Sequence, residues 1–228
     1  MPARTPAINR NRASNRALHP DRAWVRILRL LLGALTVVAV FRNFYRSALG
    51  ETDNTLPESL SQFTNEACLV FGLCLLIGTF ISRDRLPRWW DHLRGGLAFY
   101  MVITGLIYAL LVAEPGEMMR WDLEWTNLAL HRLAPVAGLI EWLLVTMTVR
   151  GTWGRPLAWL IYPILYLSYT WIRGAIVHWY PYGFLDPTQE GGWPEVLQTT
   201  ATVLIAFLAI SIIVHVLGNL RVRLAHRG

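Results

Sequence analysis

The sequence lacks lysine, contains few cysteines and carries little charge for its length. All 21 basic residues are arginine, and charged residues make up 16% of the 228 positions. The only two cysteines, Cys68 and Cys74, lie six residues apart on one predicted helix and therefore point in different directions. This spacing excludes a disulfide between them, and two cysteines supply neither a disulfide framework nor a cysteine-rich metal site.

The histidines do not follow the spacing of common metal or haem sites. There is no HExxH pattern, and a transmembrane electron carrier would need paired histidines at two matching depths. A zinc set of two histidines and a carboxylate remains an alternative for His131, His178 and Glu66, and otherwise no cofactor is expected. The apolar segments also show no repeat of the kind that marks inverted-repeat transporters.

Six apolar segments of about the length that crosses a bilayer dominate the chain. They cover approximately residues 24–45, 63–81, 96–113, 125–148, 157–178 and 196–217. The first is too long for the apolar region of a secretory signal and lacks a clear cleavage site. We therefore predict an all-α polytopic membrane protein, with a disordered basic tail at 1–22, a six-helix transmembrane domain at 23–218 and a basic tail at 219–228.

The arginines are distributed unequally between alternate connections. Sixteen lie before the first segment, at its entrance (Arg26 and Arg29) or after the second, fourth and sixth, whereas the other three connections hold two arginines and ten acids. Cytoplasmic loops collect positive charge, so we expect both termini to be cytoplasmic and the net charge of +6 to reflect topology, not nucleic-acid binding. Because a lysine-free composition is typical of a GC-rich bacterial genome, we expect a multi-pass protein of a bacterial cytoplasmic membrane.

The fourth segment contains a histidine inside the apolar stretch WTNLALHRLAP, residues 125–135. An ionisable side chain in hydrocarbon costs a few kcal/mol, so His131 is a functional candidate, although it could equally be a packing residue bonded to a neighbouring helix. Asn127 and Pro135 lie four residues to either side on the same helical face. Because Pro135 has no N–H for the carbonyl of His131, we expect a kink at the histidine with a free acceptor beside it.

Other polar groups are predicted to lie at a similar depth in the outer half of the membrane. His131 falls about 9 Å below the outer boundary at the helical rise of about 1.5 Å per residue. Thr64 and Glu66 open the second segment, and Arg173 lies near the outer end of the fifth. A shared depth in the membrane indicates that these polar groups line one pocket. Thr64 could serve there as a nucleophile and His131 as its base. Alternatively, Thr64 only caps its helix.

The fifth segment carries tyrosines on one helical face together with Arg173. Their spacing of four, three and four residues places Tyr162, Tyr166, Tyr169 and Arg173 in one stripe. Packing explains Tyr162 and Tyr166 at least as well as substrate contact does. For Arg173 we expect a functional or counter-ion role, with Glu66 as its partner.

Four stretches together resemble the androgen-induced family of six-pass membrane hydrolases and its bacterial relatives. They are QFTNEACL at 62–69, NLALHRLAP at 127–135, YPILYLSYTWIRGA at 162–175 and WYPYGFLDP at 179–187, and the resemblance covers about residues 24–218. It implies an intramembrane hydrolase of carboxylic esters, acting on fatty-acyl esters of the bilayer. The family's threonine nucleophile falls on Thr64 after Phe63, and its histidine falls on His131.

The remaining candidate residues are expected to line the pocket from their depth and spacing, and the resemblance does not assign them. Asn127, Glu66, Arg173, Tyr166 and Tyr169 are the expected substrate-binding residues, with a membrane lipid ester as the partner. The chain departs from the family pattern at Ala67 and Cys68, where relatives commonly carry Ser-Asn or Asn, and at Glu66, where an uncharged polar residue is more usual. Two alternatives therefore stay open, a non-catalytic lipid-binding membrane protein and a metal-dependent membrane hydrolase.

Overall fold

The computed structural model describes residues 21–145, 147 and 150–227, with side chains described as far as Leu224. Every regular element in this part of the chain is helical, and it contains no β-strand. The all-α prediction is therefore confirmed. The predicted N-terminal tail lies outside the described residues except for Asp21 and Arg22.

Five helices of the described chain are long and apolar enough to cross a membrane. They are α1 (Ala23–Ala48), α3 (Phe63–Phe80), α4 (Trp90–Ile107) extended by η3 (Tyr108–Val112), α7 (Gly154–Val177) and α8 (Gly192–Arg227). Apolar side chains such as Ile172 and Ile205 point outward from these helices and are 66% and 71% exposed. A surface of this kind fits a lipid environment better than water.

The helix bounds follow the apolar segments, with two differences. α4 begins at Trp90, several residues before the expected start, and α8 runs from Gly192 to Arg227 instead of covering only 196–217. The basic residues after 218 therefore continue the last helix. The short elements α2 (Leu56–Leu60), η2 (Arg83–Arg85), η4 (Glu117–Met119) and η6 (Gly183–Leu185) lie in the connections.

The predicted fourth segment is helical but broken into three consecutive pieces. These are α5 (Trp125–Leu128), η5 (Ala129–Leu133) and α6 (Ala134–Leu144). η5 is a π-helical turn, in which the N–H of Ala134 donates to the carbonyl of Ala129, five residues back. No one of these pieces is long enough to count among the five membrane-crossing helices.

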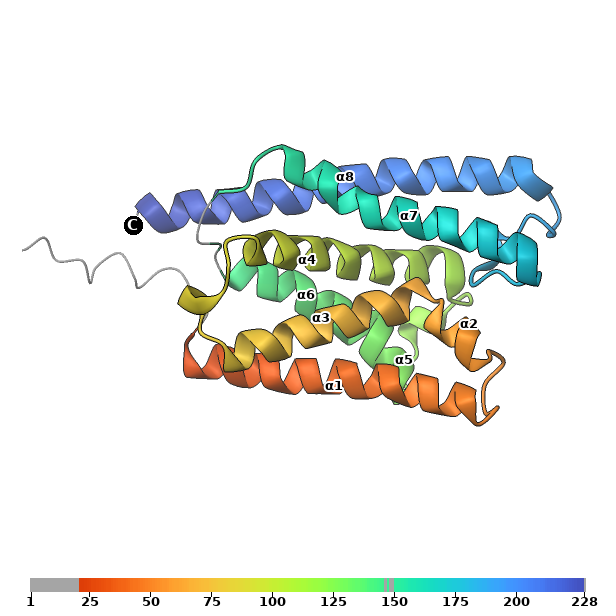
Figure 1. Ribbon diagram of the computed structural model, residues 1–228, viewed down its shortest axis with the longest axis horizontal. Helices are drawn as coiled ribbons and strands as arrows, with labels where there is room; N and C mark the ends of the chain where they lie inside the picture. Colours follow the sequence, from red (N-terminus) through yellow and green to blue (C-terminus); the bar gives the residue numbers. More distant parts are fainter. Residues whose placement is uncertain (1–20, 146, 148–149, 228) are drawn as a thin grey trace, which may run out of the picture.

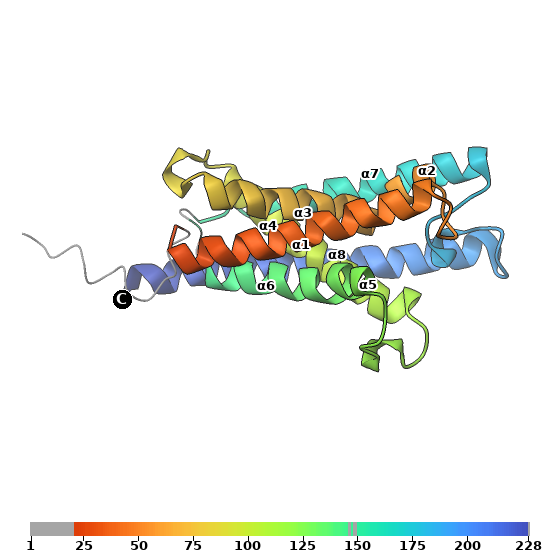
Figure 2. The same cartoon turned by 90° about the horizontal axis from the view of Figure 1, so that it is seen from below.

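α4 is the central helix of the bundle (Figure 1) and contacts α3, α6, α7 and α8. α1 packs mainly on α3, and α7 and α8 form the opposite side (Figure 1). The start of α1 and the end of α8 lie at the same end of the molecule (Figure 2). The connections that carry α2 and η6 lie at the other end, where the candidate site is found.

Candidate functional site

The first turn of α3 holds Thr64 against tyrosines from two other parts of the chain. The first N–H groups of a helix have no partner within it. Here the N–H of Phe63 donates to the Tyr166 hydroxyl at 3.1 Å, and that of Thr64 donates to the Tyr182 hydroxyl at 3.4 Å. Gln62, not Thr64, is the N-cap residue, so the interpretation of Thr64 as a helix cap is wrong.

His131 lies in the π-helical turn η5. The missing N–H of Pro135 predicts a local break at this histidine, and the structure accommodates the break as one widened turn over Ala129–Leu133. Such turns are frequent at functional sites. The His131 Nδ1 atom is buried and has no hydrogen-bond partner among the described residues.

A second π-helical turn places Tyr108 against the histidine ring. Tyr108 begins η3 at the end of α4, and its ring stacks on His131 with centroids 4.0 Å apart and planes 14° apart. The Tyr108 hydroxyl donates to the Glu117 carboxylate and accepts from Asn127 Nδ2 at 2.8 Å. Asn127 thus fixes the tyrosine that covers the His131 ring.

Thr64 and His131 both line one cavity of about 60 Å³ near this end of the bundle. A cavity of this size holds a few water molecules or part of a larger ligand. Its wall is almost entirely apolar and contains no Asp, Glu, Arg or Lys. No hydrogen bond joins the Thr64 side chain to the His131 ring within the described structure. Such contacts are often loose before substrate binds.

The other predicted site residues do not all reach this cavity. Tyr166 lines it, whereas Glu66, Tyr169 and Arg173 are absent from its wall. Glu66 accepts a hydrogen bond from Tyr162, and the Tyr169 hydroxyl lies 3.1 Å from that of Ser61. The expected pairing of Arg173 with Glu66 is wrong, because the Arg173 guanidinium lies 5.0 Å from the ring centroid of Trp179.

Three polar residues near the site were missed by sequence reasoning. Tyr182 extends into the cavity from the connection between α7 and α8, and Thr104 and Tyr108 line it from α4 and η3. Burial raises the pKa of Tyr182, so its hydroxyl remains protonated as a donor. Tyr182 belongs to the WYPYGFLDP motif, and the spacing of Thr104 and Tyr108 on one helical face could have drawn attention to them.

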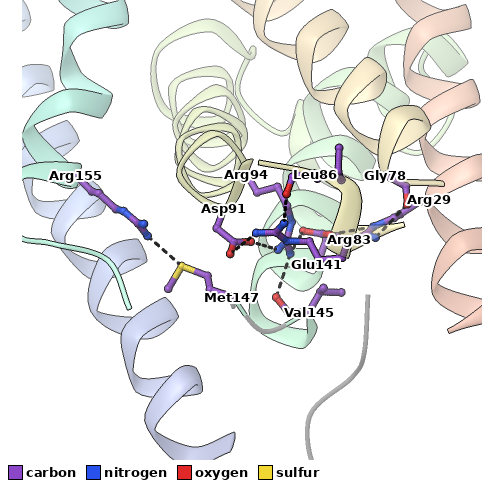
Figure 3. Close-up of polar contacts among 10 residues, drawn as sticks. All are labelled: Arg29, Gly78, Arg83, Leu86, Asp91, Arg94, Glu141, Val145, Met147 and Arg155. Atoms are coloured by element: carbon purple, nitrogen blue, oxygen red, sulfur yellow. Dashed lines mark hydrogen bonds and ion pairs between the residues drawn. The ribbon is translucent and has the colours of Figure 1, made fainter. Parts of the chain in front are cut away.

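A separate cluster of buried charges (Figure 3) lies at the start of α1, the start of α4 and the end of α6, toward the end of the bundle opposite α2 (Figure 1). Glu141 of α6 accepts hydrogen bonds from Arg29 of α1 and, at 2.9 Å, from Arg94 of α4. Asp91 accepts from Arg94 at 3.3 Å and from Arg83 of η2 at 2.9 Å. The sequence analysis does not predict this cluster, which ties together three helices and a connection.

The zinc alternative finds no support in the described residues. They contain no group of three histidine, cysteine, aspartate or glutamate side chains that could hold a metal ion. His178 ends α7 as an exposed residue with a φ of 55°, and Glu66 is hydrogen-bonded to Tyr162. Both cysteines are buried. No disulfide joins them, as their spacing predicts.

Comparisons with known proteins identify no relative of this chain. No protein-family model matches the sequence, and neither the curated proteins nor the solved structures contain a significant match.

Proposed function

We propose that this chain is a six-span protein of a bacterial cytoplasmic membrane, related to the androgen-induced family, and that it hydrolyses fatty-acyl esters within the bilayer. The proposed sixth span is the helical stretch 125–144, formed by α5, η5 and α6. Six spans place both termini on one side. The arginine-rich connections make that side the cytoplasm.

The observation that carries the catalytic proposal is the shared cavity of Thr64 and His131. They come from different helices, yet both side chains line the same apolar space. A threonine hydroxyl needs a base to become a nucleophile. His131 is the proposed base, since it lines the same cavity as Thr64.

The proposed reaction passes through an acyl-enzyme. Thr64 Oγ1 attacks the ester carbonyl carbon while His131 takes its proton, and the imidazolium then gives this proton to the departing alcohol. His131 next deprotonates a water molecule that attacks the acyl-threonine. The fatty acid leaves and the proton returns to Thr64, which restores the starting state without a cofactor.

The walls of the cavity support a substrate that is already dissolved in lipid. Phe207 and Val203 of α8 and Leu167 of α7 supply apolar surface beside Thr64. Tyr166 and Tyr182 accept hydrogen bonds from the first N–H groups of α3, which fixes the helix turn that carries Thr64. Asn127 acts indirectly by holding Tyr108 over His131.

Labelling with a long-chain fluorophosphonate probe tests this proposal on the purified protein in detergent. We expect wild-type protein to react covalently at Thr64, and Thr64→Ala and His131→Ala to abolish the reaction. Thr36→Ala is the matched control, since Thr36 is a buried threonine of α1 that bonds to the carbonyl of Leu32 at 2.8 Å. Wild-type protein that neither labels nor hydrolyses any lipid ester would disprove the hydrolase.

A non-catalytic lipid-binding protein is the second candidate. It is favoured by the missing hydrogen bond between Thr64 and His131 and by Ala67 and Cys68, two buried residues of low polarity after Thr64. In that case wild-type protein would bind fatty-acyl esters without labelling. Thr64→Ala would then bind them equally well.

A further inference from the structure

The described wall of the cavity that holds Thr64 and His131 contains six polar side chains. They are Thr64, Thr104, Tyr108, His131, Tyr166 and Tyr182. Besides a nucleophile and a base, ester hydrolysis needs a hydrogen-bond donor for the negative charge that develops on the carbonyl oxygen. The four hydroxyl groups other than that of Thr64 are the candidate side chains for this donor.

Three of these four hydroxyl groups are already bound or enclosed. The Tyr108 hydroxyl donates to the Glu117 carboxylate, and the Tyr166 hydroxyl donates to a backbone carbonyl at 2.9 Å. The Thr104 oxygen is fully buried, so a ligand in the cavity does not reach it. Tyr182 is the remaining donor of the described wall.

The Tyr182 hydroxyl lies against the proposed nucleophile. Its oxygen accepts from the Thr64 N–H at 3.4 Å, and it interacts with the Thr64 side chain as well. Acceptance of this bond uses a lone pair of the oxygen and leaves the O–H able to donate. Because linked hydrogen bonds polarise one another, the N–H at the start of α3 makes this hydroxyl a stronger donor.

The connection between α7 and α8 holds Tyr182 in place. The Tyr182 ring stacks on Phe184 with centroids 5.5 Å apart and planes 12° apart, and the adjacent Leu185 is buried in the same cavity wall. A donor on a packed side chain needs no reorganisation when charge develops. Burial raises the pKa of Tyr182, so the hydroxyl keeps its proton at neutral pH.

We propose that Tyr182 is a third catalytic residue, whose hydroxyl donates to the carbonyl oxygen of the fatty-acyl ester. The inference rests on the proposed hydrolase. As Thr64 Oγ1 bonds to the carbonyl carbon and His131 takes its proton, the carbonyl π electrons move to oxygen. This oxyanion and Oγ1 share one carbon atom, so a hydroxyl beside Thr64 reaches it, and Tyr182 keeps its proton throughout. Collapse of the intermediate restores the carbonyl and expels the alcohol, which receives its proton from His131.

Removal of the hydroxyl alone tests the role. With a neutral medium-chain p-nitrophenyl ester in detergent micelles, we expect Tyr182→Phe to lower kcat roughly 10²- to 10³-fold with little change in KM, because such donors act on the transition state. Tyr180→Phe is the matched control and should keep wild-type activity. Tyr180 belongs to the same connection, but its ring packs on Gly174 and is absent from the described cavity wall.

Tyr182 also holds the turn that carries Thr64, and two comparisons separate this positioning from donation. Tyr166→Phe removes the hydroxyl that accepts from the Phe63 N–H of the same turn, so it measures the loss from positioning and should lower kcat much less. A fluorinated tyrosine at position 182 keeps the oxygen but has a lower phenol pKa. As pH rises through that pKa the donor is lost, so kcat should fall where wild type retains its rate. Positioning alone predicts equal losses in the two phenylalanine variants and no such fall.

The outcomes separate this inference from the hydrolase itself. If Thr64→Ala is inactive while Tyr182→Phe matches wild type, Tyr182 is not the donor and the hydrolase stands. If wild type neither hydrolyses the ester nor reacts with the fluorophosphonate, the hydrolase fails and the role of Tyr182 fails with it. Thermal unfolding verifies that each variant is folded. Should Tyr182→Phe not fold, the fluorinated protein decides, and a pH profile of kcat identical to that of wild type would refute the assignment.

Discussion

Glu141 is the residue on which buried charges from two other helices converge. Its side chain is 13% exposed and accepts hydrogen bonds from Arg29 and Arg94, whose side chains are 6% and 4% exposed. A buried ion pair gains little over an apolar replacement, because desolvation offsets the attraction. Removal of one partner is different, since it leaves the remaining charges buried without compensation.

Glu141→Gln should therefore lower the free energy of unfolding by about 3–5 kcal/mol. The amide keeps the size of the side chain but removes the charge that neutralises the two guanidinium groups. Denaturant unfolding in mixed detergent micelles measures the change. Asp122→Asn is the control, because Asp122 pairs with Arg120 on the exposed surface and its loss should be undetectable. Equal stability of the two variants would show that the buried cluster does not hold the helices together.

The Glu117 carboxylate is a partly exposed group that is hydrogen-bonded to Tyr108 of the site. The hydrogen bond from the Tyr108 hydroxyl holds the pKa of Glu117 below its ordinary value of 4.5, with a further contribution from the N–H of Glu114. A carboxylate with a lowered folded-state pKa stabilises the fold above its unfolded pKa, and this contribution is lost as pH falls through the folded value.

We accordingly expect wild-type protein to be more stable than Glu117→Gln above about pH 5, with the difference shrinking as pH falls below the ordinary value of 4.5. Thermal unfolding midpoints of the two proteins from pH 3 to pH 7 give this comparison. Glu58→Gln tests another partly exposed glutamate, which accepts from the Thr55 N–H in the connection between α1 and α3. A difference between wild type and Glu117→Gln that stays constant over the whole range would contradict the assignment of Glu117 as the titrating group.

At the level of elements, α1 and α3 pack closely where both carry glycine. A Cβ atom on Gly33 would lie 3.0 Å from the carbonyl oxygen of Gly72, and one on Gly72 would lie 2.8 Å from Val37 Cγ2. Small residues allow membrane helices to approach in this way and gain van der Waals contact. The main contact of the first helix therefore depends on two positions that have no side chain.

Gly33→Ala should weaken the α1–α3 contact and destabilise the fold by about 1–3 kcal/mol, because the added methyl group meets backbone that cannot move aside. Gly154→Ala is the control, since a Cβ atom at the start of α7 would have no neighbour within 4 Å. Thermal unfolding of the two variants in one detergent makes the comparison. If Gly33→Ala is as stable as Gly154→Ala, the close approach of the two helices is not required.

The sequence predicts the long helices well and the irregular turns only in part. Apolar runs give the starts of α1 and α3 because membrane helices must satisfy their backbone internally over a fixed length. Pro135 predicts a disturbance at His131, whereas η3 has no proline, and its π-helical turn was not predicted. The stacking of Tyr108 on His131 is likewise a contact between segments distant in sequence, which no local pattern reveals.

The same limit applies to the candidate site. Helical depth predicts a similar level for Thr64 and His131, which line one cavity, but depth does not show which way a side chain points. Arg173 and Glu66 are predicted at that level too, yet their contacts are with Trp179 and Tyr162 instead. A site inside a helix bundle depends on helix rotation, which is set by packing.

For the whole molecule, the two ends of the bundle differ in charge as the proposed topology requires. The connection between α3 and α4 lies at the end where α1 begins and α8 finishes (Figure 1), and it carries Arg85 and Arg88. The opposite end carries acids such as Glu114 and Glu190. In the proposed topology, which follows the positive-inside rule, the Thr64–His131 cavity lies near the outer surface.

Single cysteines at the two ends test this orientation in intact cells. Arg85 and Gln189 are exposed and lie in connections at opposite ends, whereas the native Cys68 and Cys74 are buried and give a low background. We expect a membrane-impermeant maleimide to label Gln189→Cys in intact cells and Arg85→Cys only after permeabilisation. Labelling of both positions after permeabilisation verifies that each introduced cysteine is present and reactive. The reverse pattern would invert the topology and place the cavity near the cytoplasmic surface, whereas labelling of both positions in intact cells would contradict six spans.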